Sequence, residues 1–196
     1  PGPKGQDKDF GLPVSEQTLA SRLKAAGYVT GISGKWHIGK TEDRTPQSRG
    51  FMENIGCSEP EPDPKPEGWS AVEMETRASH KAAVDFIERH KDKPFFFYCP
   101  FSAPHAPLWA SPDVVAKFSH IQDPTRRVFA AVMSQVDDAV GDVLKTLRKH
   151  NLEENTLIFF LSDNGGPTGK RRPQPDADFE YGQNTSKNDP CRGVKG

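Results

Sequence analysis

Two short, uninterrupted apolar runs most constrain the fold of this chain. Residues 95–98 read Phe-Phe-Phe-Tyr, and residues 157–161 read Leu-Ile-Phe-Phe-Leu. Strands that are buried on both faces show such continuous runs, whereas strands with one face in water alternate apolar and polar residues. Both runs are far shorter than the roughly 20 residues that cross a bilayer. We therefore predict two buried strands of a parallel sheet and no membrane span.

Helical patterns separate these strands from each other and from a third predicted strand at residues 28–33. We predict helices at residues 14–27, 71–90, 112–118 and 123–150. Ser15 is the expected N-cap of the first helix, and the last has Asp123 as N-cap and Pro124 at its first helical position. The alternation of helices and strands predicts an α/β fold, with a mostly parallel sheet sandwiched by helices. Residues 40–70, rich in alternating prolines, are expected to form a long surface loop.

The composition limits the partners that the chain can have. Lys plus Arg number 26 and Asp plus Glu number 27, so the net charge is −1. This balance provides no overall field that would attract nucleic acid or an anionic membrane surface. The three cysteines, Cys57, Cys99 and Cys191, are too few and too scattered for a disulfide framework or a closely spaced zinc site. We therefore expect no nucleic-acid partner, while the oligomeric state stays open.

Reactive polar residues follow each predicted strand. Lys35 and His37 follow the first, His105 the second, and Asp163 and Asn164 the third. Parallel strands end at the same edge of a sheet, and ligands bind there. In extended backbone, residues two apart share a face, so Lys35 and His37 are expected to point together while Trp36 packs. The five polar residues are therefore predicted to form one site.

The two residues after the third predicted strand, Asp163 and Asn164, have the chemistry of a metal site. The carboxylate of Asp163 and the amide oxygen of Asn164 are hard ligands, suited to Ca²⁺ or Mg²⁺. Two ligands are too few, so others must come from water, substrate or further chain. Each motif alone also has a simpler interpretation, because Asp-Asn-Gly-Gly forms ordinary turns and residues 34–37 could be a turn with a solvated lysine. Their coincidence at three strand ends favours a site.

Other polar residues are assigned no catalytic role. Asp137 and Asp138 fall mid-helix between core positions, which favours salt bridges or solvent exposure. Four histidines are interpreted as structural or surface groups: His80, His90, His120 and His150.

With these motifs in order, the chain resembles the sulfatase family of the alkaline phosphatase superfamily. Residues 34–39 look like the family's Gly-Lys-Trp-His-x-Gly segment, and residues 94–107 resemble its strand followed by Ala-Pro-His. Residues 161–165 are similar to its Ser-Asp-Asn-Gly metal motif, and residues 192–196 to its closing Arg-Gly-Gly-Lys-Gly, with Val194 in place of a glycine. The resemblance implies an alkaline-phosphatase-like catalytic domain over nearly the whole chain.

The resemblance also implies roles for individual residues. Lys35 and Lys195 would bind the sulfate oxygens. His105 would contact the sulfate ester and help to protonate the leaving alcohol, and His37 would act on the nucleophile. By the same resemblance, the Ser-Asp-Asn-Gly motif would ligate a divalent cation through Asp163 and Asn164, usually Ca²⁺, with Mg²⁺ as the alternative.

One departure from the family pattern concerns the nucleophile. In the family it is a formylglycine made from Cys or Ser in a Cys/Ser-x-Pro-x-Arg motif upstream of the Gly-Lys-Trp-His segment, and none of the three cysteines lies in such a motif. We expect residues 1–196 to be a partial catalytic domain from a longer sulfatase, without its first strand, nucleophile motif and C-terminal subdomain. We expect this chain alone to be inactive and to fold weakly.

The leading hypothesis is a sulfuric ester hydrolase that acts on aryl or carbohydrate sulfates, so that the partner is a small-molecule or carbohydrate sulfate ester. One alternative keeps the fold and moves the substrate to phosphate or phosphonate esters. The other is a homologue that binds sulfated ligands without turnover.

Overall fold

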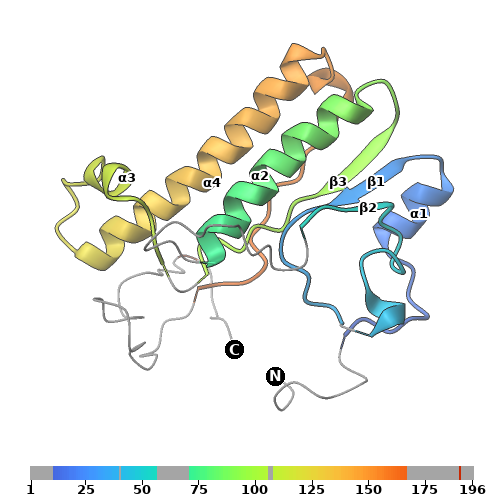
Figure 1. The fold of residues 1–196 in the computed structure, drawn as a ribbon, viewed down its shortest axis with the longest axis horizontal. Coiled ribbons are helices and arrows are strands. Elements are labelled where there is room, and N and C mark those ends of the chain that lie inside the picture. Colours follow the sequence, from blue (N-terminus) through green and yellow to red (C-terminus); the bar gives the residue numbers. More distant parts are fainter. Residues whose placement is uncertain (1–10, 40, 57–70, 106–107, 167–189, 191–196) are drawn as a thin grey trace.

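A three-stranded parallel sheet lies between helices in the computed structural model, which describes residues 11–39, 41–56, 71–105, 108–166 and 190 (Figure 1). The strands are β1 (Val29–Ile32), β2 (Glu53–Asn54) and β3 (Phe95–Tyr98), in the order β2-β1-β3. Along β1 and β3 the partners run from Val29 with Phe95 to Ile32 with Tyr98. The predicted α/β fold with a parallel sheet is confirmed.

Hydrogen bonds to N-cap side chains mark the start of two of the helices. They are α1 (Leu19–Ala25), α2 (Ala71–His90), α3 (Pro112–Ala116) and α4 (Pro124–Lys149), with the 3₁₀ helices η1 (Glu42–Arg44) and η2 (Glu153–Asn155). The Asp123 carboxylate accepts the Arg126 amide at 3.0 Å, so α4 starts as predicted. The predicted start of α1 is wrong, because Thr18, rather than Ser15, caps it by accepting the Ser21 amide.

Helix α2 covers one face of the sheet through a layer of aromatic rings. Phe86 is fully buried, and its ring centroid lies 4.7 Å from that of Phe97 and 6.0 Å from that of Phe95. Gly31 is the matching position on β1, where an added Cβ would lie 2.4 Å from the Phe86 ring. The absence of a side chain at Gly31 therefore lets α2 approach the sheet backbone closely.

The opposite face of the sheet packs on α1 and on the segment before β2. Phe96 and Tyr98 alternate with the residues that face α2, and their rings stack on Phe51 at 6.1 and 6.3 Å. Ile32, Ala20 of α1 and Phe51 form one buried cluster. Helices thus lie on both faces of the sheet, but β3 is less buried than predicted, because Phe95–Phe97 are only half-buried and Tyr98 is 46% exposed.

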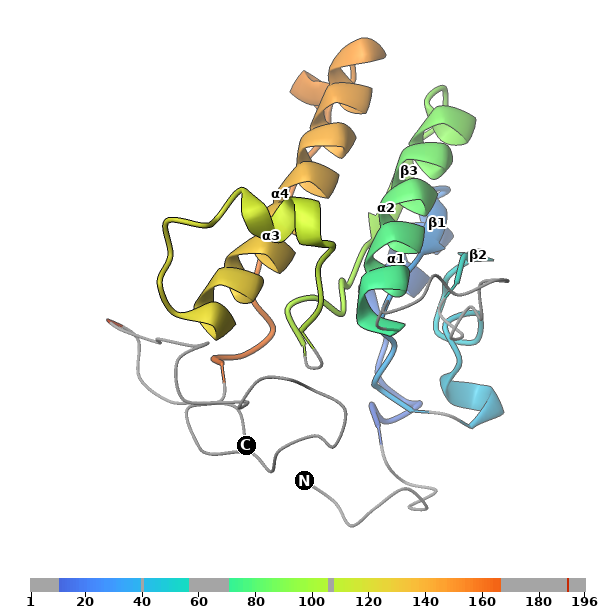
Figure 2. The ribbon, with the colours of Figure 1, turned by 60° about the vertical axis from the view of Figure 1, so that its left-hand side comes forward.

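The long helix α4 packs along α2 on the side away from the sheet (Figures 1 and 2). Its buried residues include Val128, Val132, Val136 and Leu147. None of the helices in the described residues combines the length and the apolar character that a membrane span requires.

Three of the histidines that were interpreted as structural or surface groups form ion pairs, two of them across the interface between α2 and α4. His80 lies 3.1 Å from Asp142, and His150 lies 2.7 Å from Glu88. His90 pairs with a carboxylate of β2, and His120 is exposed. Both carboxylates of the mid-helix pair, Asp137 and Asp138, are exposed, so the structural interpretation of these polar residues is confirmed.

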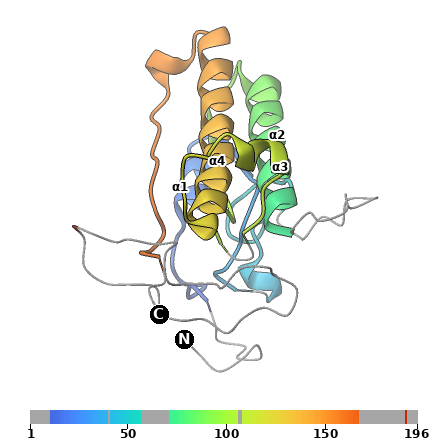
Figure 3. The ribbon, with the colours of Figure 1, turned by 90° about the vertical axis from the view of Figure 1, so that its left-hand side faces the viewer.

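The prediction of a buried strand at residues 157–161 is wrong. This segment pairs with no strand in the described part of the chain, and it runs back extended from η2 (Figure 3). Its five side chains are between 45% and 81% exposed. A strand forms only where a neighbour accepts its backbone hydrogen bonds, and β2, β1 and β3 bond only to each other. The apolar run alone does not supply that neighbour.

The prediction that residues 40–70 form only a loop is also wrong for its described part. Residues 42–44 form η1, and β2 pairs in parallel with β1. Phe51, 5% exposed, anchors the segment in the core just before β2. A two-residue strand is too short to leave a periodic pattern that sequence analysis could detect. The proline-rich residues 57–70 lie outside the described residues.

Candidate functional site at the carboxyl ends of β1 and β3

The chain segments that leave β1 and β3 run side by side at one edge of the sheet. The Ser33 amide donates to the Tyr98 carbonyl at 3.2 Å, and the Lys35 amide donates to the Pro100 carbonyl at 2.8 Å. Gly34 makes this approach sterically feasible, because a Cβ there would lie 2.3 Å from the Pro100 oxygen. The backbones of the Gly-Lys-Trp-His and Ala-Pro-His segments therefore start from a shared edge.

Trp36 fixes the segment that carries Lys35 and His37. Its indole Nε1 donates to the Arg44 carbonyl at 2.9 Å, and its ring meets Phe51 edge-on at 5.9 Å. Trp36 therefore packs inward, as predicted from its place between the two polar residues. Lys35 is half-buried and His37 is exposed.

The segment that carries His105 turns sharply after β3. The His105 amide donates to the Ser102 carbonyl at 2.7 Å, and the imidazole side chain is exposed. The Ser102 hydroxyl donates to the Glu75 carboxylate of α2 at 2.5 Å. A side-chain hydrogen bond therefore ties this turn to the helix that covers the sheet.

The first half of α2 presents polar groups to both strand ends. Ser79 is buried, with its hydroxyl 3.4 Å from that of Ser33 and its carbonyl 3.8 Å from the Cys99 sulfur. Thr76 is also buried. Sequence reasoning assigned no role to Glu75, Thr76 or Ser79. The available signal was Thr76 and Ser79, two small polar residues three positions apart on a helix whose other buried positions are Ala, Phe and Ile.

Asp163 and Asn164 lie in an exposed turn after the unpaired segment 157–161. The Ser162 hydroxyl donates to the Asn164 carbonyl at 2.8 Å, and the Asn164 amide nitrogen donates to the Gly165 carbonyl at 2.9 Å. No cluster of three or more His, Cys, Asp or Glu side chains suited to a metal ion occurs among the residues whose placement is described.

The predicted site residues thus divide into three groups. Lys35, His37 and His105 follow strands that end at one edge, although the convergence of their side chains stays a prediction. Asp163 and Asn164 do not follow a third strand of the sheet. Lys195 lies outside the described residues, as do Cys57 and Cys191.

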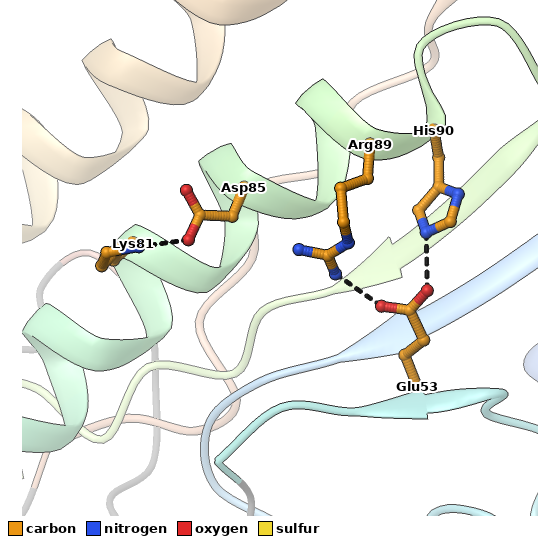
Figure 4. Close-up of polar contacts among 5 residues, drawn as sticks. All are labelled: Glu53, Lys81, Asp85, Arg89 and His90. Carbon is orange, nitrogen blue, oxygen red and sulfur yellow. Dashed lines mark hydrogen bonds and ion pairs between the residues drawn. The ribbon is translucent and has the colours of Figure 1, made fainter.

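Among the carboxyl groups with resolved pKa shifts, Glu53 and Glu88 form ion pairs between structural elements. Burial of Glu53 on β2 opposes its ionisation, but hydrogen bonds from Arg89 and His90 outweigh burial and lower the pKa of the carboxyl (Figure 4). Lys81 and Asp85 form a separate pair on the surface of α2. Glu53 thus joins β2 to α2, whereas the Lys81–Asp85 pair lies within α2.

Comparison with protein families decides the assignment of the chain. The profile of the Sulfatase family matches residues 3–189. The chain belongs to the sulfatase family. This confirms the family expected from the Gly-Lys-Trp-His, Ala-Pro-His and Ser-Asp-Asn-Gly motifs.

Similar sulfatases include human N-acetylgalactosamine-6-sulfatase, which is 32% identical over 181 residues. That match covers 79% of this chain and 34% of the human protein. Arylsulfatase J of Mus musculus is 29% identical over 208 residues, covering 94% of this chain and 32% of the mouse protein. The chain therefore spans about a third of the length of these sulfatases.

Solved structures agree with the family and the fold. The crystal structure of Ps i-CgsB is 30% identical, with a TM-score of 0.68 over 82% of this chain and 43% of that one. The same protein was solved in complex with k-i-k-neocarrahexaose. PsFucS1 sulfatase from Pseudoalteromonas sp. is 23% identical, with a TM-score of 0.63 over 83% of this chain and 40% of that one, which supports the fold alone.

Proposed function

We propose that the intact protein hydrolyses sulfate esters at the edge where β1 and β3 end, and that this chain supplies part of its catalytic domain. The observation that carries the proposal is the 2.8 Å bond between the Lys35 amide and the Pro100 carbonyl. It joins the backbones of two segments whose ammonium and imidazole groups suit an anionic ester. Membership of the sulfatase family gives the reaction class its support.

Each cationic group has a task that the chemistry of a sulfate ester defines. Charge on the sulfate oxygens must be neutralised and the leaving oxygen must receive a proton. Lys35 and Lys195 bind the sulfate oxygens as point charges, which need no planar geometry. His105 contacts the ester and donates the proton to the leaving alcohol, while His37 acts on the nucleophile. That nucleophile is a formylglycine in this proposal, and no cysteine of this chain lies in its motif.

The oxygen donors of residues 163 and 164 fit a hard divalent cation. The Asn164 amide nitrogen already donates to the Gly165 carbonyl, which leaves the amide oxygen as the atom that can face a cation beside the Asp163 carboxylate. We assign Ca²⁺ to these two residues, with Mg²⁺ as the alternative. A cation held there would supply Lewis-acid stabilisation of the sulfate charge.

Names of relatives support a carbohydrate sulfate as the substrate. One is an N-acetylgalactosamine-6-sulfatase, and another was crystallised with k-i-k-neocarrahexaose. Both align with this chain at 30% identity or more. Aryl sulfates remain the convenient assay substrates for the same bond cleavage.

The test compares initial rates of the intact protein on an aryl sulfate and on the matching aryl phosphate. We expect a clear preference for the sulfate. Lys35→Ala and His105→Ala should each lower kcat about 100-fold or more, because each removes charge stabilisation or proton transfer. His120→Ala is the matched control, since His120 is also exposed and belongs to the α3–α4 connection. A preference for phosphate would replace the proposal with a phosphate or phosphonate esterase, and sulfate-ligand binding without turnover would replace it with a binding protein.

A further inference from the structure

Helix α2 reaches the turn that carries His105 through one short polar contact. The Ser102 hydroxyl donates to the Glu75 carboxylate at 2.5 Å, between residues 27 apart in sequence, and both groups are partly buried. A second contact from α2 to this segment joins the Cys99 sulfur to the Ser79 carbonyl at 3.8 Å. Sulfur is a weak donor, so the carboxylate contact is the stronger restraint.

Ser102 links this restraint directly to the histidine. Its side chain bonds to Glu75, and its carbonyl accepts the His105 amide at 2.7 Å. The two bonds fix the same residue from two directions, one from the helix and one from within the turn. Because His105 is exposed, its own burial does little to hold the imidazole in one place.

We propose that Glu75 is a positioning residue for His105 and acts through the Ser102 hydroxyl. The proposal rests on the sulfate-ester hydrolysis proposed above, in which His105 donates a proton to the leaving alcohol. Proton transfer needs the donor within hydrogen-bond reach of the leaving oxygen, so a loosened turn lowers the rate of the chemical step. Substrate binding by the lysines depends less on this turn, and KM should change little.

The kinetic test uses four variants of the intact protein. Glu75→Ala and Ser102→Ala should each lower kcat about tenfold, the effect of losing one hydrogen bond to a charged group, and leave KM within about twofold. The double variant should be no slower than either single one, because both substitutions remove the same bond. Glu75→Gln keeps an acceptor oxygen of the same reach and should recover most of kcat.

A control on the same helix separates this role from helix stability. Asp85→Ala removes the surface ion pair with Lys81 and should leave kcat unchanged. All the variants should unfold within a few degrees of the unsubstituted protein. An unchanged kcat in Glu75→Ala, additive losses in the double variant, or no recovery in Glu75→Gln would each overturn the proposal.

Amide hydrogen exchange tests the proposal independently of activity. The His105 amide is hydrogen-bonded to Ser102, so Glu75→Ala should speed its exchange about tenfold, while the amides of the α2 interior stay unchanged. If the unsubstituted protein hydrolyses no sulfate ester, the proposed function fails but this exchange measurement still decides whether Glu75 orders the turn. Equal exchange at His105 in both proteins would overturn the positioning role.

Discussion

Replacing Gly34 by alanine should separate the two chain segments that form the candidate site. Gly34 has φ +124°, a backbone conformation that favours glycine, and an added Cβ would lie 2.3 Å from the Pro100 oxygen and 2.9 Å from its carbonyl carbon. The obstructing atoms belong to the backbone, so no rotamer change can relieve the clash. The chain must move, and the 2.8 Å bond from the Lys35 amide to Pro100 lengthens or breaks.

The loss of unfolding free energy expected for Gly34→Ala has two parts. An alanine at positive φ costs about 1–2 kcal/mol. Overpacking against a fixed neighbour adds about 1–3 kcal/mol, so Gly34→Ala should lower the free energy of unfolding by about 2–5 kcal/mol. Because the displaced bond joins the two segments of the candidate site, the aryl sulfatase activity that we propose should fall as well.

Two other glycines provide matched controls in urea titrations followed by tryptophan fluorescence. Gly27 has φ +89° with nothing within 4 Å of an added Cβ, so Gly27→Ala should show the conformational cost without the clash. Gly141 lies inside α4 and also has open space, so Gly141→Ala should stabilise the protein by up to about 1 kcal/mol. A Gly34→Ala cost no larger than that of Gly27→Ala would refute the argument that close contact with Pro100 holds the segments together.

Three further substitutions test other parts of the structure. Trp36→Phe keeps an aromatic ring but removes the donor to the Arg44 carbonyl, so unfolding free energy should fall by about 1 kcal/mol in urea titrations, and no change would contradict a fixing role for the indole nitrogen. The pKa of Glu53 is held below its ordinary 4.5, so its pair with Arg89 stabilises the fold above that pH and is lost as pH falls through the folded value. Glu53→Gln should therefore flatten the rise of the melting temperature with pH in the acidic range, and an unaltered slope would count against the pair. Phe159, at the centre of residues 157–161, is 74% exposed, so Phe159→Ser should change the free energy of unfolding by less than about 0.5 kcal/mol. A larger loss would mean that the segment is buried in solution.

The sequence predicted those elements whose signals are local. The Asp123–Pro124 pair marks the start of α4 because capping and a fixed φ act within one turn. The aromatic run of β3 and the span of α2 were also predicted correctly. The shared edge of β1 and β3 was predicted from the general rule that strands with continuous apolar runs pair in parallel.

Features that depend on distant partners could not be predicted in this way. Residues 157–161 have the composition of a buried strand, but composition does not create the neighbour that a strand must bond. The contact between Glu75 and Ser102 joins residues 27 positions apart, and its formation depends on how α2 settles on the sheet. Glu75 is one of many polar residues on α2, so nothing in the sequence distinguishes it as the partner of Ser102.

The bare backbone at Gly31 has a consequence for the far end of α2. Phe86 rests on that position, and Glu75 lies eleven residues earlier on the same helix, about 16 Å away at 1.5 Å per residue. A helix of this length moves nearly as a rigid rod, so a methyl group at Gly31 would tilt it about its other contacts and change the reach of Glu75. If Glu75 positions His105 as we propose, the close approach of α2 at Gly31 also sets where the turn that carries His105 lies.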